Sequence, residues 1–234
     1  MRIVLFTGAG ISAESGLNTF RDNGGLWEQY RVEDVATPEA FARNPELVLR
    51  FYDRRRAQVL HARPNEAHRA IAGMEEFADV HVVTQNVDDL HERAGSTRVL
   101  HVHGEILKAR STLDPAIVLP VQGAELRLGD LCPLGSQLRP HIVWFGEEVP
   151  LLDEAATILS RADVLVVVGS SLQVWPAAGL VHAARPEAQV HVVDPDAGKL
   201  PLASRPRADG ITYWKQKASM GVPMLAEYLR KQAG

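Results

Sequence analysis

The amino-acid sequence predicts a doubly wound α/β fold, in which helices cover both faces of a parallel sheet. Two apolar runs, one at residues 3–6 and one inside the segment 163–169, lack the polar alternation of a half-exposed strand and indicate strands buried on both faces. Each run ends in a loop rich in glycine or serine, at the strand end where open α/β sheets bind ligands. The chain of 234 residues, 46% of them hydrophobic, is long enough for one large core. We therefore expect a single Rossmann-like domain over residues 1–234, with a small module and a helical insertion.

The loop after the first strand has the composition of an anion-binding turn. It reads Gly8-Ala9-Gly10-Ile11-Ser12-Ala13 and satisfies the dinucleotide fingerprint Gly-x-Gly-x-x-Ala in a strand-to-helix setting. The glycines allow a tight turn and a close backbone approach to a ligand, and residues 12–15 can open a helix whose free N–H groups face that ligand. We predict a pyrophosphate site here, with an ordinary glycine turn as the alternative.

Composition and charge exclude several classes of protein. The net charge of −4 gives no general electrostatic reason to bind nucleic acid or an anionic membrane. No apolar run is long enough to span a membrane, and the chain enters a core strand without the basic and apolar segments of a cleavable leader. The single cysteine, Cys132, excludes an intrachain disulfide. We expect a cytoplasmic protein.

Three helix starts are marked by a capping residue. Thr37 and Asn44 each precede a proline and an acid, and Asn65 precedes an acid. We expect the second of these helices to run to about Leu60 and the third to cover residues 66–74.

The second helix carries polar side chains on more than one face. Tyr52 and Arg55 are three positions apart, which places them on the same face of a helix. Arg54 and Arg56 are expected to lie on a solvated face instead.

A polar segment follows the next predicted strand, residues 80–84. Gln85 and Asn86 offer amide donors and acceptors that can hold ribose hydroxyls and a carboxamide, and Asp88 is an acceptor once ionised. The segment again lies at the carboxyl end of a strand, where a ligand is expected. An ordinary turn rich in Asn and Asp is the alternative.

Three segments together make the chain resemble the sirtuin family. Residues 8–21 match the family pattern GAGxSxxSGhxxFR, residues 84–95 match TQNxDxLHxxAG, and residues 138–147 closely follow LRPxVVWFGE. The resemblance spans nearly the whole chain, is weakest at residues 106–138, and implies the sirtuin fold with NAD as the cofactor. The residues that it assigns to the cofactor are Gly8, Ala9, Gly10, Ser12, Phe20, Arg21, Gln85, Asn86, Asp88, Gly169, Ser170, Ser171, Lys217 and Ala218.

The resemblance assigns the general base to His103, which precedes Gly104 in the His-Gly pair that sirtuins use. An imidazole with an unperturbed pKa of about 6.5 can accept a proton at neutral pH. Asn86, which by resemblance contacts the nicotinamide, shares the catalytic role. The other histidines beside apolar strands are expected to be structural: His81, His101 and His191.

Residues 106–138 depart from the family, most of whose members insert a ribbon with two Cys-x-x-Cys pairs that bind a structural zinc. The matching positions here are Ser111, Asp114, Cys132 and Gly135. One thiol with a serine and a carboxylate is not a structural zinc set, so we predict no metal. Cys132 is then a small buried hydrophobe. We expect packing of apolar residues to hold the module: Ile117, Val118, Leu119, Val121, Leu126, Leu128 and Leu131.

The resemblance also suggests how an acyl-lysine is bound. It implies a substrate channel lined by Val143, Trp144, Phe145 and Gly146, which without the resemblance would be read as a core strand. Sirtuins that prefer succinyl, malonyl or glutaryl groups have a Tyr-x-x-Arg pair, which Tyr52 and Arg55 reproduce. A guanidinium and a phenol on one helix face can bind the free carboxylate of an acidic acyl chain. Alternatively, Arg55 pairs with another carboxylate and Tyr52 packs in the core.

The resemblance therefore implies an NAD-dependent protein-lysine deacylase, with succinyl- or malonyl-lysine preferred and some activity on acetyl-lysine. In the family chemistry the acyl oxygen attacks the ribose carbon as nicotinamide leaves, and the base then deprotonates a ribose hydroxyl. The products are nicotinamide, free lysine and an acylated ADP-ribose. Proteins carrying acyl-lysine are the expected partners. ADP-ribosyl transfer to a protein, NAD hydrolysis, and an NAD-binding sensor without turnover use the same pocket and stay open as alternatives.

Overall fold

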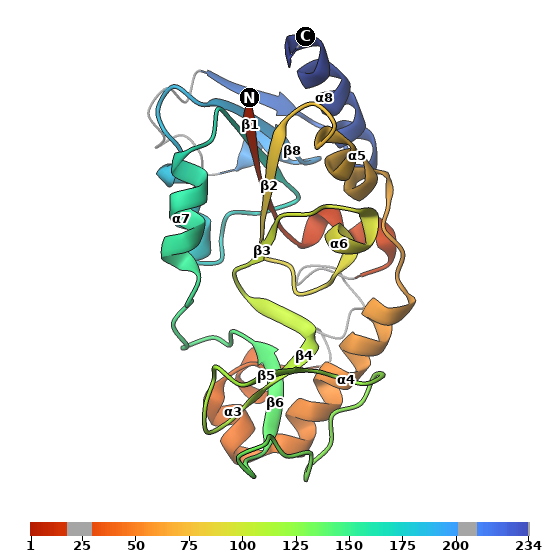
Figure 1. Cartoon of the computed structure of the whole chain (residues 1–234), viewed down its shortest axis with the longest axis vertical. Helices are drawn as coiled ribbons and strands as arrows, with labels where there is room; N and C mark the ends of the chain where they lie inside the picture. The colour runs from red at the N-terminus through yellow and green to blue at the C-terminus, as the bar shows by residue number, and fades with distance from the viewer. Residues whose placement is uncertain (18–29, 201–209, 234) are drawn as a thin grey trace.

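The computed structural model describes residues 1–17, 30–200 and 210–233. The described part has a larger lobe around a parallel sheet and a smaller lobe around an antiparallel sheet, as Figure 1 shows. The predicted cofactor residues Phe20 and Arg21 lie outside the described residues. None of the described helices combines the length and hydropathy needed to cross a membrane.

Six parallel strands form the larger sheet in the order β3-β2-β1-β7-β8-β9. The strands are β1 (Arg2–Thr7), β2 (Asp79–Thr84), β3 (Val99–His101), β7 (Val164–Val168), β8 (Gln189–Val193) and β9 (Ile211–Trp214). The chain builds outward from β1 to β3, then places β7 on the other side of β1 and builds outward again to β9. This order confirms the predicted doubly wound fold, and it puts the topological switch point between β1 and β7, where such sheets bind ligands.

Both faces of this sheet are covered, which explains the unbroken apolar strands. Ile3 and Leu5 of β1 belong to one core cluster, and Val4 and Phe6 belong to a second cluster on the opposite face. The first cluster includes residues of α5 and α8, and the second includes residues of α7 and a 3-10 helix. These helices are α5 (Glu66–Met74), α7 (Leu152–Ser160), α8 (Ala218–Ala233) and the 3-10 helix Ala177–Ala183. The predicted helix at residues 66–74 is confirmed.

The smaller lobe combines a short antiparallel sheet with helices. Its strands pair in the order β5-β4-β6, and its elements are α2 (Val32–Val35), α3 (Pro38–Arg43), α4 (Pro45–His61), β4 (Gly104–Ser111), β5 (Val118–Pro120) and β6 (Leu138–Ile142). The Thr37 hydroxyl accepts a hydrogen bond from the Ala40 amide at 3.0 Å, and Asn44 accepts one from the Leu47 amide at 3.1 Å. Both predicted helix starts are confirmed, and both caps are of the usual N-terminal type.

The packing of the smaller lobe corrects three expectations. Leu126 and Cys132 are buried as predicted, but Leu128 and Leu131 are 46% and 55% exposed. Arg54 is exposed, whereas Arg56, expected to be solvated, is fully buried. Arg56 tolerates burial because Asp53 and backbone carbonyls accept its hydrogen bonds.

Candidate active site

The loops after β1 and β7 cross at the switch point, and glycines make the crossing possible. The Gly8 amide donates to the Val168 carbonyl at 3.0 Å, and the Gly10 amide donates to the Gly169 carbonyl at 2.9 Å. A Cβ atom added to Gly10 would lie 2.7 Å from the Gly169 Cα atom, which no real side chain could occupy. Gly169 itself has a φ of 57°, a conformation that favours glycine. The sequence predicted that these glycines let the backbone approach a ligand closely. In the structure they also let the loop after β1 approach the loop after β7.

The segment after Gly8 does not form the predicted helix. Ala9–Ile11 and Ala13–Ser15 are separate 3-10 turns, and Gly16 ends the second one with a φ of 85°. A left-handed residue stops a helix, so the expectation of a helix opening at residues 12–15 was wrong. The backbone amides of residues 9–15 still lie directly after β1, at the switch point. They belong to 3-10 turns and not to a regular α-helix.

Three predicted cofactor residues from two loops meet behind this crossing. The Ser12 hydroxyl donates to the Asp88 carboxylate at 3.0 Å and accepts from the Asn86 side-chain amide at 3.1 Å. All three residues are buried. Burial raises the pKa of Asp88, although the Leu90 amide, the Ser12 hydroxyl and the positive charge of His101 act in the opposite direction. Asn86 and Asp88 thus form one hydrogen-bonded cluster with the first loop.

Gln85 connects the same loop to the segment after β7. The Ser170 hydroxyl donates to its side-chain oxygen at 2.9 Å, while its side-chain nitrogen is buried and has no hydrogen-bond partner among the described residues. Buried amide donors are normally satisfied, so this nitrogen fits a ligand that brings hydroxyl or phosphate oxygens. Ser171, the next predicted residue, is half-buried beside this contact. The residues at the switch point therefore fit a dinucleotide.

The predicted residues at the start of α8 lie beside the first loop. Lys217 is exposed and Ala218 is buried in the core. The Glu14 carboxylate accepts hydrogen bonds from the Ser219 amide at 3.1 Å and the Ser219 hydroxyl at 2.9 Å. This contact joins α8 to the glycine-rich loop and brings the two predicted cofactor segments together.

His103 has the protonation pattern that a general base requires. Its Nδ1 atom lies 3.2 Å from the Gln85 carbonyl oxygen, which can only accept, so Nδ1 carries the hydrogen and Nε2 keeps its lone pair. Burial lowers the pKa of His103, with the hydrogen bond to Gln85 acting in the opposite direction. His103 is therefore neutral at physiological pH and has a nitrogen ready to take a proton.

The glycine after His103 is required by packing. Gly104 has a φ of 83°, and a Cβ atom on it would lie 2.1 Å from the His141 carbonyl oxygen. Strands β4 and β6 could not approach each other with any other residue at this position. The His-Gly pair thus combines the predicted general base with a glycine that lets β4 pack closely against β6. The predicted substrate segment follows β6.

The predicted substrate segment is hydrogen-bonded to the proposed base. The Val143 amide donates to the His103 carbonyl at 2.9 Å. Trp144 is buried, Phe145 is 44% exposed, and Gly146 has a φ of 88°. This segment follows the end of β6, so it is neither a core strand nor far from His103.

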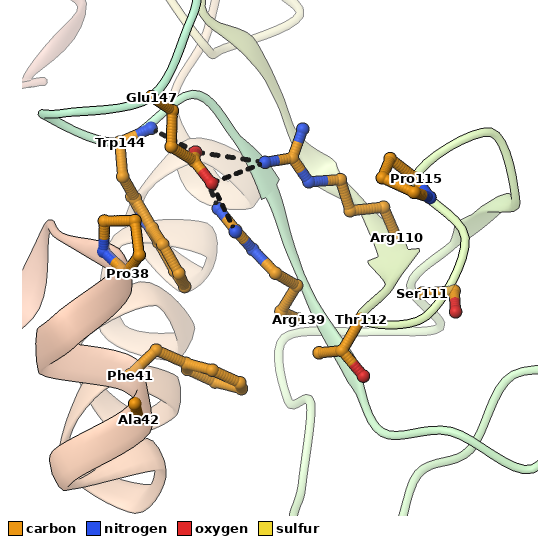
Figure 2. Close-up of a pocket in the computed structure, with 10 residues that line it drawn as sticks. All are labelled: Pro38, Phe41, Ala42, Arg110, Ser111, Thr112, Pro115, Arg139, Trp144 and Glu147. Atoms are coloured by element: carbon orange, nitrogen blue, oxygen red, sulfur yellow. Dashed lines mark hydrogen bonds and ion pairs between the residues drawn. The ribbon is translucent and has the colours of Figure 1, made fainter.

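A cluster of charged residues holds the predicted substrate segment in place. The sequence analysis did not single out these residues. Figure 2 shows the Glu147 carboxylate between Arg110 and Arg139, in a cavity of about 350 Å³ that Trp144 and Phe41 also line. Glu147 accepts from Arg139 at 2.6 and 3.0 Å, from Arg110 at 3.0 and 3.1 Å, and from the Trp144 amide at 2.8 Å. The Arg139 guanidinium also lies 3.3 Å from the centre of a Trp144 ring. This cluster fixes Trp144, and the only signal in the sequence was the charge on both sides of the aromatic run.

Tyr52 contacts the predicted substrate segment, and Arg55 is close enough to Asp88 for their charges to interact. Trp144 Nε1 donates to the Tyr52 hydroxyl at 3.0 Å, and burial raises the pKa of Tyr52 to about 12. Tyr52 is buried in the core, as the structural alternative required. Burial lowers the pKa of the half-buried Arg55, and the negative charge of Asp88 opposes that change. Arg55 is therefore within electrostatic range of the loop that carries Asn86.

The positions that match the zinc cysteines are also close together. The Ser111 hydroxyl accepts from the amides of Leu113 and Asp114 at 3.0 and 3.1 Å, and it interacts with the Cys132 thiol. The Gly135 amide donates to the Cys132 carbonyl at 2.8 Å. Within residues 1–17, 30–200 and 210–233, no group of three or more His, Cys, Asp or Glu side chains is arranged to hold a metal ion.

The fold and the crossed loops place the chain among the doubly wound, dinucleotide-binding α/β proteins. Comparison with known proteins narrows this class, since the model of the Sir2 family matches residues 8–176. An NAD-dependent protein deacylase of Helicobacter pylori is 52% identical over 195 residues, which are 83% of each chain. One from Vibrio vulnificus is 43% identical over 237 residues, covering 97% of this chain and 93% of the relative. A Sir2 homologue solved as an NAD complex is 41% identical, with a TM-score of 0.88 over 100% of this chain and 91% of that chain. The chain belongs to the Sir2 family.

Proposed function

We propose that this chain removes acidic acyl groups, succinyl or malonyl, from protein lysines. It is an NAD-dependent protein deacylase, the activity for which relatives 50–52% identical to it are named. NAD is its cofactor, as in the Sir2 homologue solved with NAD. The acidic preference rests on Arg55, which is half-buried on α4, lies three positions from Tyr52, and is close enough to Asp88 for their charges to interact.

The site geometry supports the proposed cofactor contacts. Residues 8–12 and 169–171 lie at the switch point and would hold the phosphates and a ribose, while Gln85 offers an amide nitrogen that no other described residue binds. By resemblance to the family, Asn86 and Asp88 would hold the nicotinamide end, and Ser12 hydrogen-bonds to both side chains. NAD supplies an electrophilic ribose carbon and nicotinamide as the leaving group.

The chain's own residues then orient the acyl-lysine and move one proton. The segment at residues 143–146 would hold the lysine stem beside His103, to which the Val143 amide is bonded. His103 Nε2 takes the proton of a ribose hydroxyl, because its Nδ1 hydrogen is committed to Gln85. Such a base contributes about 10² to 10⁴ in rate. The Arg55 guanidinium and the Tyr52 hydroxyl would pair with the far carboxylate of a succinyl or malonyl group.

The acyl preference is tested by Arg55→Met, assayed with succinyl-, malonyl- and acetyl-lysine versions of one peptide. The acidic substrates should lose about 10- to 100-fold in kcat/KM, the range of a charged hydrogen bond, whereas the acetyl substrate should lose little. Arg54→Met is the matched control, because Arg54 is exposed on the same helix. Equal losses on all three substrates would contradict the proposal.

Mass spectrometry of the NAD-derived products separates deacylation from the other uses of this pocket. Acylated ADP-ribose is expected with the wild-type protein, and His103→Ala should suppress it while NAD binding is largely kept. ADP-ribose alone, or ADP-ribose attached to protein, would instead favour NAD hydrolysis or ADP-ribosyl transfer.

A further inference from the structure

We infer that His101 is a positively charged positioning residue of the active site, which with Glu92 holds the Asn86 carbonyl and sets a positive charge beside Asp88. This inference rests on the proposed roles of Asn86 and Asp88. It departs from the expectation that His101 is merely structural.

The charge follows from the partners of the two ring nitrogens. His101 Nδ1 lies 2.9 Å from the Asn86 carbonyl oxygen, and Nε2 lies 2.7 Å from the Glu92 carboxylate. A carbonyl oxygen only accepts hydrogen bonds, and so does an ionised carboxylate. A neutral imidazole has one N–H group and can serve only one of them. Both contacts are made together only by the imidazolium ion.

The position of the proton between His101 and Glu92 is set by exposure. The His101 side chain is 6% exposed, whereas the Glu92 side chain is 41% exposed. Water therefore stabilises the ionised form of the Glu92 carboxylate, so the shared proton resides on His101. Burial alone would lower the pKa of His101, but Glu92, the Asn86 carbonyl and the charge of Glu105 raise it above its usual value.

Charged groups from all the surrounding elements act on His101. Glu92 and His91 lie on α6 (Leu90–Ala94), Glu105 lies on β4, and Asp88 lies in the preceding loop. Among these, Glu92 is hydrogen-bonded to the ring, while Glu105 forms an ion pair with Lys108 at 2.7 Å. Glu92 is therefore the residue whose removal should discharge His101.

A charged His101 would affect two proposed active-site residues, Asn86 and Asp88. Asn86 is held at its carbonyl by His101, at its amide by Thr84 at 3.0 Å, and at its side chain by Ser12 at 3.1 Å. The positive charge of His101 also opposes the effect of burial on Asp88 and favours its ionised, accepting form. Loss of the charge should weaken both the nicotinamide site and the acceptor beside it.

The opposite protonation of two nearby histidines predicts a bell-shaped pH profile. Activity should rise with pH as His103 becomes neutral and fall at higher pH as His101 loses its charge. The two limbs belong to different residues, so a change at Glu92 should move only the upper one.

The direct test is nitrogen NMR of the apo protein labelled with ¹⁵N-histidine. At pH 7 we expect both ring nitrogens of His101 to be protonated in the wild type, and one of them to be unprotonated in Glu92→Gln. A neutral His101 in the wild type would overturn the inference. This result depends on no enzymatic activity, so it is distinguishable from failure of the proposed function.

The kinetic test compares Glu92→Gln with wild type across pH. In Glu92→Gln the high-pH limb of the kcat/KM profile for NAD should move to lower pH by about one unit. At a fixed pH on that limb, kcat/KM should therefore fall about tenfold. KM for the acyl-peptide should be unchanged. His81→Gln is the matched control, because His81 also contacts a carboxylate, Asp79 at 3.2 Å, but lies near the start of β2. A lower melting temperature with an unmoved pH limb would mean that the pair is only structural.

Discussion

Arg56→Met should strongly destabilise the smaller lobe, although Arg56 sits on a helix whose neighbour Arg54 is exposed. The Arg56 guanidinium is fully buried and donates to the Ile106 carbonyl at 2.8 Å, the Asp53 carboxylate at 2.6 Å and the Ala124 carbonyl at 2.8 Å. One side chain thus joins α4 to β4 and to the loop that follows β5. Methionine keeps most of the aliphatic stem and removes the donors.

The expected loss is set by the groups that the substitution would leave behind. Burial raises the pKa of Asp53 and lowers the pKa of Arg56, so each partner is partly desolvated. Removing one member of a buried ion pair costs about 3–5 kcal/mol. Asp53 keeps the Leu126 amide at 3.0 Å, and its side chain is 18% exposed. We therefore expect the lower end of that range, about 3 kcal/mol.

Equilibrium unfolding in denaturant measures this loss, with Arg54→Met as the matched control. Arg54 is exposed and donates to the Tyr30 hydroxyl at 3.1 Å, so its replacement should change the free energy of unfolding by less than about 0.5 kcal/mol. The double variant Asp53→Asn with Arg56→Met should recover part of the loss, because no charge is then left buried. A loss below about 1 kcal/mol for Arg56→Met, or equal losses for the two single variants, would refute this reasoning.

Two further predictions concern metal content and acid stability. Elemental analysis of the purified protein should find no stoichiometric zinc, and a chelator should leave its melting temperature unchanged; stoichiometric zinc with unfolding by the chelator would show that residues 106–138 form a metal site after all. Burial lowers the pKa of His68 and of His191 to about 4, and both are below the unfolded value of 6.5, so the unfolded state binds more protons and stability falls as pH drops from about 6.5 to 4. Each histidine should contribute about 3 kcal/mol to that fall. His191→Gln should therefore show a smaller difference than the wild type between the free energies of unfolding at pH 7 and pH 4.5. An unchanged difference would show that His191 is not buried in its neutral form.

Much of the fold could be predicted from the sequence because its signals are local. The apolar run at residues 3–6 has no polar alternation, and it becomes a strand whose two faces enter different core clusters. The caps at Thr37, Asn44 and Asn65 each bind a backbone amide in the first turn of a helix. These features depend on a few neighbouring residues, so the sequence contains what is needed to read them.

The burial of individual polar residues could not be predicted in the same way. Arg54 and Arg56 lie on different faces of α4, and Arg56 is on the buried face with Tyr52 and Val59, where an arginine is not expected. Arg56 is satisfied there by acceptors that its own helix does not supply, such as the carbonyls of Ile106 and Ala124, which are 50 and 68 positions away in the chain. Contacts between distant segments decide such cases. The helix expected at residues 12–15 fails for a local reason, because Gly16 follows it directly and adopts the left-handed conformation that ends helices.

The two histidines at positions 101 and 103 show how the same side chain receives different chemistry. Both are largely shielded from water, and burial acts in the same direction on both pKa values. Within the described part of the chain His103 meets one acceptor, the Gln85 carbonyl, which leaves the imidazole neutral with its Nε2 lone pair available. His101 meets two acceptors, one of them a solvated carboxylate from α6, and therefore needs a second proton. Since both imidazoles bond to consecutive carbonyls of one loop, at Gln85 and Asn86, that loop receives a base from one ring and a positive charge from the other.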